Sequence, residues 1–457
     1  MNARPTIIIG AGWSGLAAAV ELTRQGQCVH IYESAKQAGG RARRVTFKGK
    51  DIDNGQHLLI GAYTECLRLF NFVGINTTTQ LKRLPLLLTV IDKSGIKLNL
   101  SAPALPAPLH LLYALLTAQG LKFKQRVAAI RFGLYLKVIH YQLKQDISVQ
   151  ALLQKTKQPE ILIRQLWEPL CLATMNTPIS IASANIFMRV FKDAFTSKTK
   201  DADLLLPTVD LSRLFPDAAI NYIKNNGGEV HLKSRVEKIQ VDGQQVTSIT
   251  VKSNHESKTI DTNNVIIATA PQNLNKLLSN SGILKPTQEK LERFNYEPIV
   301  TVYLQYSEDI NLTQSMIGLS NTLSQWVFDR GSFTEHKGLV SVVISSQNRD
   351  KPAVDSHLAM DDDTITKLVH DEIAVLFSTQ PNLLNSFVIR EKRATFSCAV
   401  NINQMRPKNK TLIAGLMLAG DYTDTHYPAT LEGAVRSGLT AAKLIQNNLK
   451  QIEAIHE

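Results

Sequence analysis

Three glycines near the start of the chain have the spacing that binds a dinucleotide. Gly10, Gly12 and Gly15 follow a β-branched run, and Glu33 stands at the end of the next apolar segment. Such glycines allow a tight turn and bring the backbone close to a pyrophosphate, whose charge the N-terminus of the following helix attracts. A carboxylate at Glu33 can accept hydrogen bonds from an adenosine ribose. The pattern predicts a dinucleotide site, and a glycine-rich turn without a ligand is the alternative.

Further glycine motifs distinguish between NAD and FAD. Gly39, Gly40 and Arg41 offer more backbone amides and a positive charge for the same pyrophosphate. Near the other end of the chain, Gly420 and Asp421 end an apolar run, and this carboxylate can bond a ribityl hydroxyl. A nicotinamide site would normally be completed within one early domain. A cofactor that contacts residues from both ends of the chain is more typical of FAD. No cysteine or histidine lies in a motif for covalent flavin attachment, so we expect non-covalent binding.

The loop over residues 53–57 is too polar for a core strand and too rich in glycine for a helix. We expect it to lie against the flavin ring; the alternative is a simple turn with Asn54 and Gly55 at its corner. A helix that begins near Thr430 would direct its N-terminal amides at the electron-rich end of the flavin. The residues predicted to bind FAD are Gly10, Gly12, Trp13, Ser14, Gly15, Glu33, Ser34, Gly39, Gly40, Arg41, Ala42, Asn54, Gly55, Gln56, Val236, Gly420, Asp421, Thr430, Leu431 and Ala434.

The elements that must position these residues follow from the apolar pattern. A buried strand over residues 6–9, a helix over 16–25 and a strand over 28–32 form the first unit. A hairpin over 239–251 and a strand from Val265 resemble the second half of the same domain, resumed after an insertion. The remaining predictions are strands over 84–91, 299–306 and 339–345, and helices over 62–73, 148–155, 159–174, 180–195 and 362–378.

These segments predict an α/β fold with a Rossmann-type FAD-binding domain and a discontinuous α+β substrate domain. The length of 457 residues provides material for two or three structural units. We assign residues 1–78, 216–284 and 396–457 to the FAD-binding domain. Residues 79–215 and 285–395 are assigned to the substrate-binding domain.

The net charge of +12 admits nucleic acid, an anionic membrane surface or anionic substrates as partners. No nucleic-acid-binding module is recognisable, which excludes the first class. The chain shows neither a signal peptide nor an apolar run of about 20 residues, so we expect a cytoplasmic protein. The cysteines have no pattern of a zinc site or a disulfide framework, so no metal is predicted; they are Cys28, Cys66, Cys171 and Cys398.

Residues 103–139 combine two features that admit two interpretations. Residues 103–116 are apolar but interrupted by prolines, and basic residues between 122 and 144 alternate with leucine, phenylalanine and tyrosine. Apolar segments beside basic residues suit a monotopic contact with anionic lipid, here on the inner face of the cytoplasmic membrane. The alternative is a helical cap domain with an ordinary solvated face.

Three motifs in series are similar to those of the FAD-dependent amine oxidase and phytoene desaturase superfamily, and the match covers the whole chain. They lie at residues 10–15, 39–41 and 420–438. Within this superfamily the chain resembles the hydroxysqualene dehydroxylases, squalene-associated flavoproteins of bacterial hopanoid-type pathways. The segments that carry this narrower resemblance are residues 53–63, 166–178, 211–218, 325–330 and 390–396.

The resemblance implies a reduction. Hydroxysqualene would lose its allylic hydroxyl as water and receive a hydride from N5 of reduced FAD, which gives squalene. A triterpene or polyprenyl substrate, an apolar tunnel with a membrane-facing entrance, and association with upstream squalene-pathway enzymes are also implied. A carotenoid or phytoene-type desaturase and an amine oxidase stay open as alternatives. A non-catalytic flavin-binding carrier of polyprenyl intermediates is the alternative from another class.

The sequence does not decide which residue protonates the leaving hydroxyl. His57 and Asp53 are the only titratable pair in the loop expected at the flavin ring. We therefore predict His57 as the catalytic residue, with Asp53 orienting it or acting in its place. The alternative is that both residues only fix the loop. Glu168 is a second candidate, and Tyr427 and Asp424 are expected to shape the start of the last helix.

Overall fold

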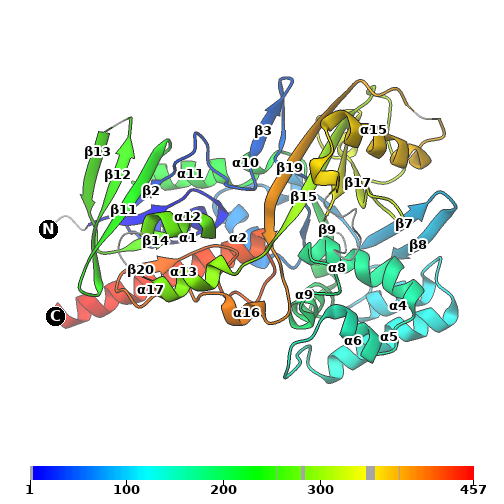
Figure 1. Cartoon of the computed structure of the whole chain (residues 1–457), viewed down its shortest axis with the longest axis horizontal. Helices are drawn as coiled ribbons and strands as arrows, with labels where there is room; N and C mark the ends of the chain where they lie inside the picture. Colours follow the sequence, from blue (N-terminus) through cyan, green and yellow to red (C-terminus); the bar gives the residue numbers. More distant parts are fainter. Residues whose placement is uncertain (1–3, 255, 279–283, 346–355, 380, 457) are drawn as a thin grey trace.

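A five-stranded parallel sheet gathers strands from both ends of the chain (Figure 1). The computed structural model describes all residues except 1–3, 255, 279–283, 346–355, 380 and 457. The sheet order is β10-β2-β1-β14-β20, and every neighbouring pair is parallel. Its strands are β1 (Thr6–Ile9), β2 (Val29–Tyr32), β10 (Glu229–His231), β14 (Val265–Ile267) and β20 (Leu416–Leu418).

Two helices pack closely on this sheet because glycines stand at their points of contact. The helix α1 (Trp13–Arg24) follows β1 directly and contacts the long C-terminal helix α17 (Leu431–His456). A Cβ atom on Gly438 would lie 2.1 Å from the carbonyl oxygen of Ser14, so only glycine allows this approach. Gly10, with φ +105°, makes the turn between β1 and α1 in the left-handed region that favours glycine.

A second, mostly antiparallel sheet forms the other large layer, in the order β19-β15-β18-β17-β16-β7-β8. Only the β16–β7 pair is parallel. The helix α15 (Asp362–Ile373) packs on it through Ile365, Val369 and Ile373, which are buried with the strand residues. The strands are β7 (Leu87–Asp92), β8 (Gly95–Ser101), β15 (Tyr296–Gln305), β16 (Met316–Leu319), β17 (Trp326–Asp329), β18 (Leu339–Ile344) and β19 (Asn385–Phe396).

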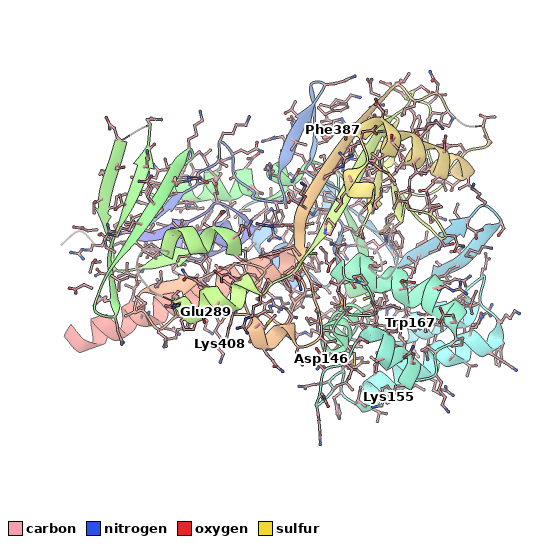
Figure 2. All side chains as sticks on the ribbon, in the orientation of Figure 1. Asp146, Lys155, Trp167, Glu289, Phe387 and Lys408 are labelled. Atoms are coloured by element: carbon pink, nitrogen blue, oxygen red, sulfur yellow. The ribbon has the colours of Figure 1, made fainter. Side chains whose placement is uncertain are left out.

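A lobe of helices over residues 109–195, here called the helical lobe, lies beside the second sheet (Figure 1). Between α7 and α8 the chain forms a π-helical turn, Ile163–Trp167, so the predicted helix over 159–174 is one continuous helical run. Trp167, labelled in Figure 2, lies within this lobe. The helices are α4 (Leu109–Thr117), α5 (Phe123–Val138), α6 (Val149–Lys155), α7 (Glu160–Leu162), α8 (Glu168–Met175) and α9 (Ala184–Phe195).

Smaller elements connect these layers. The predicted hairpin is present as β11 and β12, with Gly243 at its turn. The strands are β3 (Arg44–Phe47), β4 (Lys50–Asp53), β5 (Leu59–Ile60), β6 (Leu81–Leu84), β9 (Leu204–Pro207), β11 (Ser234–Asp242), β12 (Gln245–Ser253) and β13 (Glu256–Asp261). The helices are α2 (Thr64–Phe72), α3 (Thr77–Gln80), α10 (Leu211–Leu214), α11 (Pro216–Asn225), α12 (Pro271–Leu278), α13 (Lys285–Glu292), α14 (Ser356–Ala359) and α16 (Ile402–Met405). Short 3₁₀ turns cover Thr199–Ala202, Arg330–Ser332 and Ala374–Leu376.

Three predicted element boundaries are corrected. The single strand over 84–91 is wrong, because Pro85 has no N–H to donate and separates β6 from β7, which belong to different sheets. The helix expected from residue 180 begins only at Ala184, where the Ser183 hydroxyl accepts the amide of Ile186 as an N-cap. The helix expected to reach 378 ends at Ile373 and continues as a 3₁₀ turn.

The predicted fold class is confirmed: a Rossmann-type α/β sheet stands beside a mixed α+β region. The strands of the parallel sheet come from the three segments assigned to FAD binding, while the boundaries of the two domains stay a prediction. In the described part of the chain, no helix combines the length and the apolar character that crossing a bilayer requires.

Candidate active site

A cavity of about 970 Å³ extends from the parallel sheet into the helical lobe. Its polar end is lined by residues from separate stretches of the chain, which include 9–14, 32–42, 54–57, 234–237, 268–270 and 420–434. The other part, here called the apolar chamber, is lined mainly by the second sheet and the helical lobe. Its large apolar side chains include Leu88, Leu111, Leu115, Ile130, Leu166, Trp167, Phe187, Phe191, Met316 and Phe328.

The tertiary structure brings nearly all the predicted site residues together on this cavity. Of the residues predicted to bind FAD, only Gly15 does not line it. Gly15 instead lies against the β1–α1 turn, where a Cβ atom would be 2.1 Å from the carbonyl oxygen of Gly10. Of the predicted catalytic pair, His57 lines the cavity and Asp53 does not.

The start of α1 is open toward the polar end. Gly12 is the N-cap residue and has no side chain to cap the helix, and a Cβ atom there would meet nothing within 4 Å. Glu33 is held in place nearby, because its two carboxylate oxygens accept the amides of Ala11 and Ala35, each at 2.8 Å. Each oxygen keeps acceptor capacity for a hydroxyl group. This arrangement fits the pyrophosphate and ribose of FAD.

The opposite wall of the polar end is held by two arginines. Arg41 donates to the Asp421 carboxylate at 2.6 Å, which joins the second glycine motif to the C-terminal one. The buried Arg406 donates to the carbonyl oxygens of Asp421 and Tyr427 at 2.8 and 2.7 Å, so it fixes the turn that precedes α17. No local sequence pattern marks Arg406, because its partners become neighbours only in the folded chain.

Glu432 also links distant segments. Its carboxylate is fully buried and accepts the amides of Glu65 and Cys66 at the start of α2, at 3.1 and 2.9 Å. Arg436 donates to the same carboxylate at 2.7 Å, so the buried charge is compensated. This contact fixes the first turn of α17 relative to α2.

His57 lies on the polar end of the cavity in an environment that keeps it neutral. Burial, together with the positive charges of Arg330 and Arg41, lowers the pKa of His57 to about 4. At neutral pH the ring therefore carries no extra proton to donate, and its remaining N–H is a very weak acid. This electrostatic setting argues against His57 as the general acid and leaves it the role of a hydrogen-bonding group.

Asp53 does not orient His57, so that part of the predicted pairing is wrong. The buried Asp53 carboxylate accepts the amide of Leu211 at 2.7 Å and lies 3.4 Å from two nitrogens of Arg330. Burial raises the pKa of Asp53 to about 6, although the charge of Arg330 opposes this shift. Arg330 also donates to Gln56 Oε1 at 2.9 Å. Asp53, which does not line the cavity, thus fixes the loop over residues 53–57 through its contacts with Leu211 and Arg330.

A second titratable pair, whose members lie too far apart in the sequence to be linked by any local pattern, lies on the cavity. The Tyr427 hydroxyl donates to Oδ2 of Asp193 in a short hydrogen bond, and both residues line the cavity. Arg189 Nε lies 3.0 Å from the same carboxylate oxygen, and the Arg436 guanidinium is 4.6 Å from the Tyr427 ring centroid. Burial, and then the bond to Asp193, raise the pKa of Tyr427. Tyr427 also lies in the turn before α17, where its carbonyl oxygen accepts from Arg406, in keeping with the role expected of it at the start of this helix.

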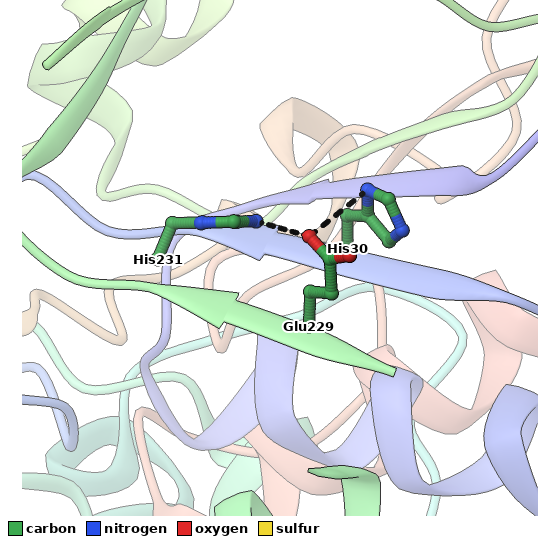
Figure 3. A group of neighbouring side chains, drawn as sticks. All are labelled: His30, Glu229 and His231. Carbon is green, nitrogen blue, oxygen red and sulfur yellow. Dashed lines mark hydrogen bonds and ion pairs between the residues drawn. The ribbon is translucent and has the colours of Figure 1, made fainter. Parts of the chain in front are cut away.

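Glu168 and a cluster of two histidines with a glutamate lie outside this site. Glu168, the second proton-donor candidate, does not line the cavity. Outside it, His30, Glu229 and His231 lie together on the edge strand β10 and its neighbour β2 (Figure 3). Glu229 Oε2 is 2.8 Å from His231 Nε2 and 3.8 Å from His30 Nδ1, and one potential ligand atom from each residue lies within 4.8 Å of those of the other two. The hydrogen bond between Glu229 and His231 and the exposure of Glu229 to solvent explain this cluster, and we assign no metal to it.

Comparison with known proteins agrees with this site. Residues 13–446 match the family of flavin-containing amine oxidoreductases. The hydroxysqualene dehydroxylase of Zymomonas mobilis is 27% identical, over 96% of this chain and 98% of that protein. The chloroplastic/chromoplastic 15-cis-phytoene desaturase of Glycine max is 25% identical, over 96% of this chain and 79% of that protein.

Solved structures show the same fold. An oxidoreductase from Methanosarcina mazei superposes with a TM-score of 0.72 at 16% identity, and the match covers 96% of this chain and all of that one. The predicted resemblance and the predicted FAD cofactor are both confirmed by the family. The chain therefore belongs to the flavin-containing amine oxidoreductases and is an FAD-dependent oxidoreductase.

Proposed function

We propose that this protein reduces hydroxysqualene to squalene. The observation that carries the proposal is the continuity of one cavity from the polar end, where FAD fits, into a long apolar chamber. A triterpene has no polar group except its hydroxyl, so it needs a chamber of this kind with polar groups only at the reacting end. The similarity to hydroxysqualene dehydroxylases over nearly the whole chain supports the same reaction.

The reaction balances as follows: hydroxysqualene, one proton and reduced FAD give squalene, water and oxidised FAD. Bound FAD in its reduced form supplies the hydride. The chain itself must hold the hydrocarbon, exclude bulk water from an allylic cation and deliver the proton to the departing hydroxyl. The apolar chamber serves the first two tasks because its leucine, phenylalanine and tryptophan side chains offer no nucleophile.

The proton donor in this proposal is the Asp193–Tyr427 pair, because Arg189 and Arg436 lie beside it and stabilise the negative charge that the departing proton leaves. Asp193 lies on α9 among apolar chamber residues such as Phe191 and Phe195, whereas Tyr427 directly precedes the turn at Thr430. The proton on Tyr427 Oη, shared with Asp193, thus stands where the polar end and the apolar chamber meet. His57 keeps a supporting role as a neutral hydrogen-bonding group, and Asp53 holds the loop.

Several finer points belong to the same proposal. The substrate would be drawn from the inner face of the cytoplasmic membrane, and the enzymes that make it would stand upstream in the same pathway. Phytoene-type desaturation is the second candidate, because plant phytoene desaturases are also similar over nearly all of this chain. A desaturase would oxidise its substrate and leave the flavin reduced, so the direction of electron flow separates the two.

One experiment tests the proposal directly. The purified flavoprotein is reduced without oxygen and mixed with hydroxysqualene, and both the flavin spectrum and the products are followed. We expect squalene to appear in equal amount as the oxidised flavin spectrum returns. Reduced protein without substrate is the control for slow reoxidation. A flavin that stays reduced, with no squalene formed, would refute the dehydroxylase; phytoene offered to the oxidised protein then tests the desaturase.

A further inference from the structure

One segment of the chain has a charge pattern unlike the rest. Between Asp92 and Asp146 there is no aspartate or glutamate, but there are eight lysines and arginines, a large share of the net charge of +12. This segment contains β8, α4 and α5. Among its cations, those exposed to solvent include Lys122, Lys124, Arg131, Lys137 and Lys144. A segment with exposed cations and no acidic residue of its own attracts an anionic partner.

The helices of this segment expose apolar side chains along one face each. On α4 the exposed residues are Leu109, Leu112, Tyr113 and Leu116, at the i, i+3, i+4, i+7 spacing of a single helix face. On α5 they are Phe123, Val127, Leu134 and Val138, of which Phe123 and Val138 are 72% and 75% exposed. A solvated face of a helix normally carries polar residues, so these faces call for an apolar partner.

The cavity reaches the surface between these two faces. Leu112 of α4 and Leu134 of α5 are exposed to solvent and also line the apolar chamber. Leu111 and Ile130, one step further inside, continue the apolar lining. The exposed faces of α4 and α5 therefore flank an opening, whose lining on these two helices is apolar apart from the exposed Lys137.

We propose that these two helix faces, here called the docking face, bind the surface of a bilayer that contains anionic phospholipid. The apolar side chains enter the acyl region, and the lysines and arginines around them contact the headgroups. The opening beside Leu112 and Leu134 then faces the acyl chains, so an apolar substrate passes into the chamber without crossing water. The lipid contact rests on the surface alone, and only the passage of a triterpene rests on the proposed function.

The test compares vesicle binding of variants that leave the cavity untouched. The apolar variant carries Leu109→Ser, Phe123→Ser and Val138→Ser, and the charge variant carries Lys124→Glu and Arg131→Glu; none of these residues lines the cavity. Matched controls are Leu412→Ser, at an 86% exposed leucine, and Lys258→Glu on β13, both outside the docking face. Binding is measured by sedimentation with vesicles of phosphatidylcholine, alone or mixed with phosphatidylglycerol.

We expect wild type and controls to bind only the vesicles with phosphatidylglycerol, and less strongly at high salt. The apolar and charge variants should bind at least tenfold more weakly with unchanged flavin content. Equal binding by all variants, or no binding by wild type, would overturn the proposal. A dimer that the apolar variant abolishes, without vesicle binding, would also overturn it and assign the face to a second copy of the chain. Vesicle binding is measured without turnover. Its outcome therefore does not depend on whether the dehydroxylase assay succeeds or fails.

Discussion

At the scale of single residues, the main question is which group delivers the proton. Asp193 and Tyr427 are joined by a hydrogen bond across 234 positions of the chain and both line the cavity. If their shared proton reaches the leaving hydroxyl, Asp193→Asn and Tyr427→Phe should each lower kcat by about 10²-fold or more, with flavin content unchanged. Anaerobic single-turnover assays with hydroxysqualene measure this loss.

A matched control for this prediction is His57→Ala on the same cavity. Because His57 is neutral at pH 7, its loss should cost less than that of either member of the pair. The outcome that contradicts the assignment is a loss at His57→Ala that exceeds both others, since the proton would then pass through the imidazole.

The two opposite pKa shifts in the loop over residues 53–57 predict opposite effects on stability. His57 has a pKa of about 4 in the folded chain against an ordinary value of 6.5, so the unfolded chain binds more protons between these pH values. The free energy of unfolding therefore falls as the pH decreases through this window, by up to about 3 kcal/mol. The raised pKa of Asp53, about 6, acts in the opposite direction between about pH 4 and 6.

Denaturant unfolding of His57→Gln between pH 7 and 4, a window set by these pKa values, checks this sign. The variant should lose less free energy of unfolding on acidification than wild type does. The exposed His140→Gln variant is measured beside it as the reference for a general histidine effect. An identical pH slope in wild type and His57→Gln would show that the imidazole does not titrate as the folded environment indicates.

At the scale of elements, the contact between α1 and α17 holds the two ends of the chain together at the polar end. Gly438→Ala would bring a Cβ atom to 2.1 Å from the backbone oxygen of Ser14, so the helices must move apart. We expect a loss of about 1–3 kcal/mol in the free energy of unfolding and weaker retention of flavin. Urea unfolding and flavin release measure both quantities.

Gly133→Ala is the helical control for that experiment. Gly133 lies in α5, where a Cβ atom would meet nothing within 4 Å. The substitution should leave stability unchanged or raise it by up to about 1 kcal/mol, because alanine favours the helix. Equal destabilisation by both variants would mean that close packing of α17 on α1 is not the cause.

At the scale of the whole molecule, the path from the opening to the polar end should limit how a long substrate reaches the flavin. Leu112→Trp narrows the rim of the cavity without touching the polar end. It should lower kcat/KM for hydroxysqualene roughly tenfold, about 1.4 kcal/mol in transition-state free energy. Reduction of the flavin by dithionite, which is small, should keep its wild-type rate.

Leu116→Trp provides the comparison on the same helix. Leu116 is exposed on α4 but does not line the cavity. Its substitution should leave kcat/KM in detergent solution unchanged. If both tryptophan variants lower turnover equally, the effect comes from the surface of α4 and not from the width of the opening.

Local patterns in the sequence were enough to predict the cofactor, the fold class and most elements. The turn after β1 depends on Gly10 and its neighbours, and the hairpin of β11 and β12 depends on a glycine at its corner; both are short-range properties that residue types determine. The cation-rich, apolar segment at 103–144 is also visible in the sequence, but its composition fits a membrane contact and a solvated helical cap alike, and the membrane contact stays a proposal. Where a local feature was overlooked, as at Pro85, the predicted strand was wrong.

Only the tertiary structure decided which distant side chains meet. Asp53 pairs with Arg330 and not with His57, and Tyr427 pairs with Asp193. Nothing in the spacing of these residues predicts such partners, because each contact depends on how whole elements pack. The pKa values follow the same rule, since they depend on burial and on charges that only folding brings close. The sequence therefore determined the cofactor and the fold class of this protein, and the packing of its elements decided which groups face the cavity.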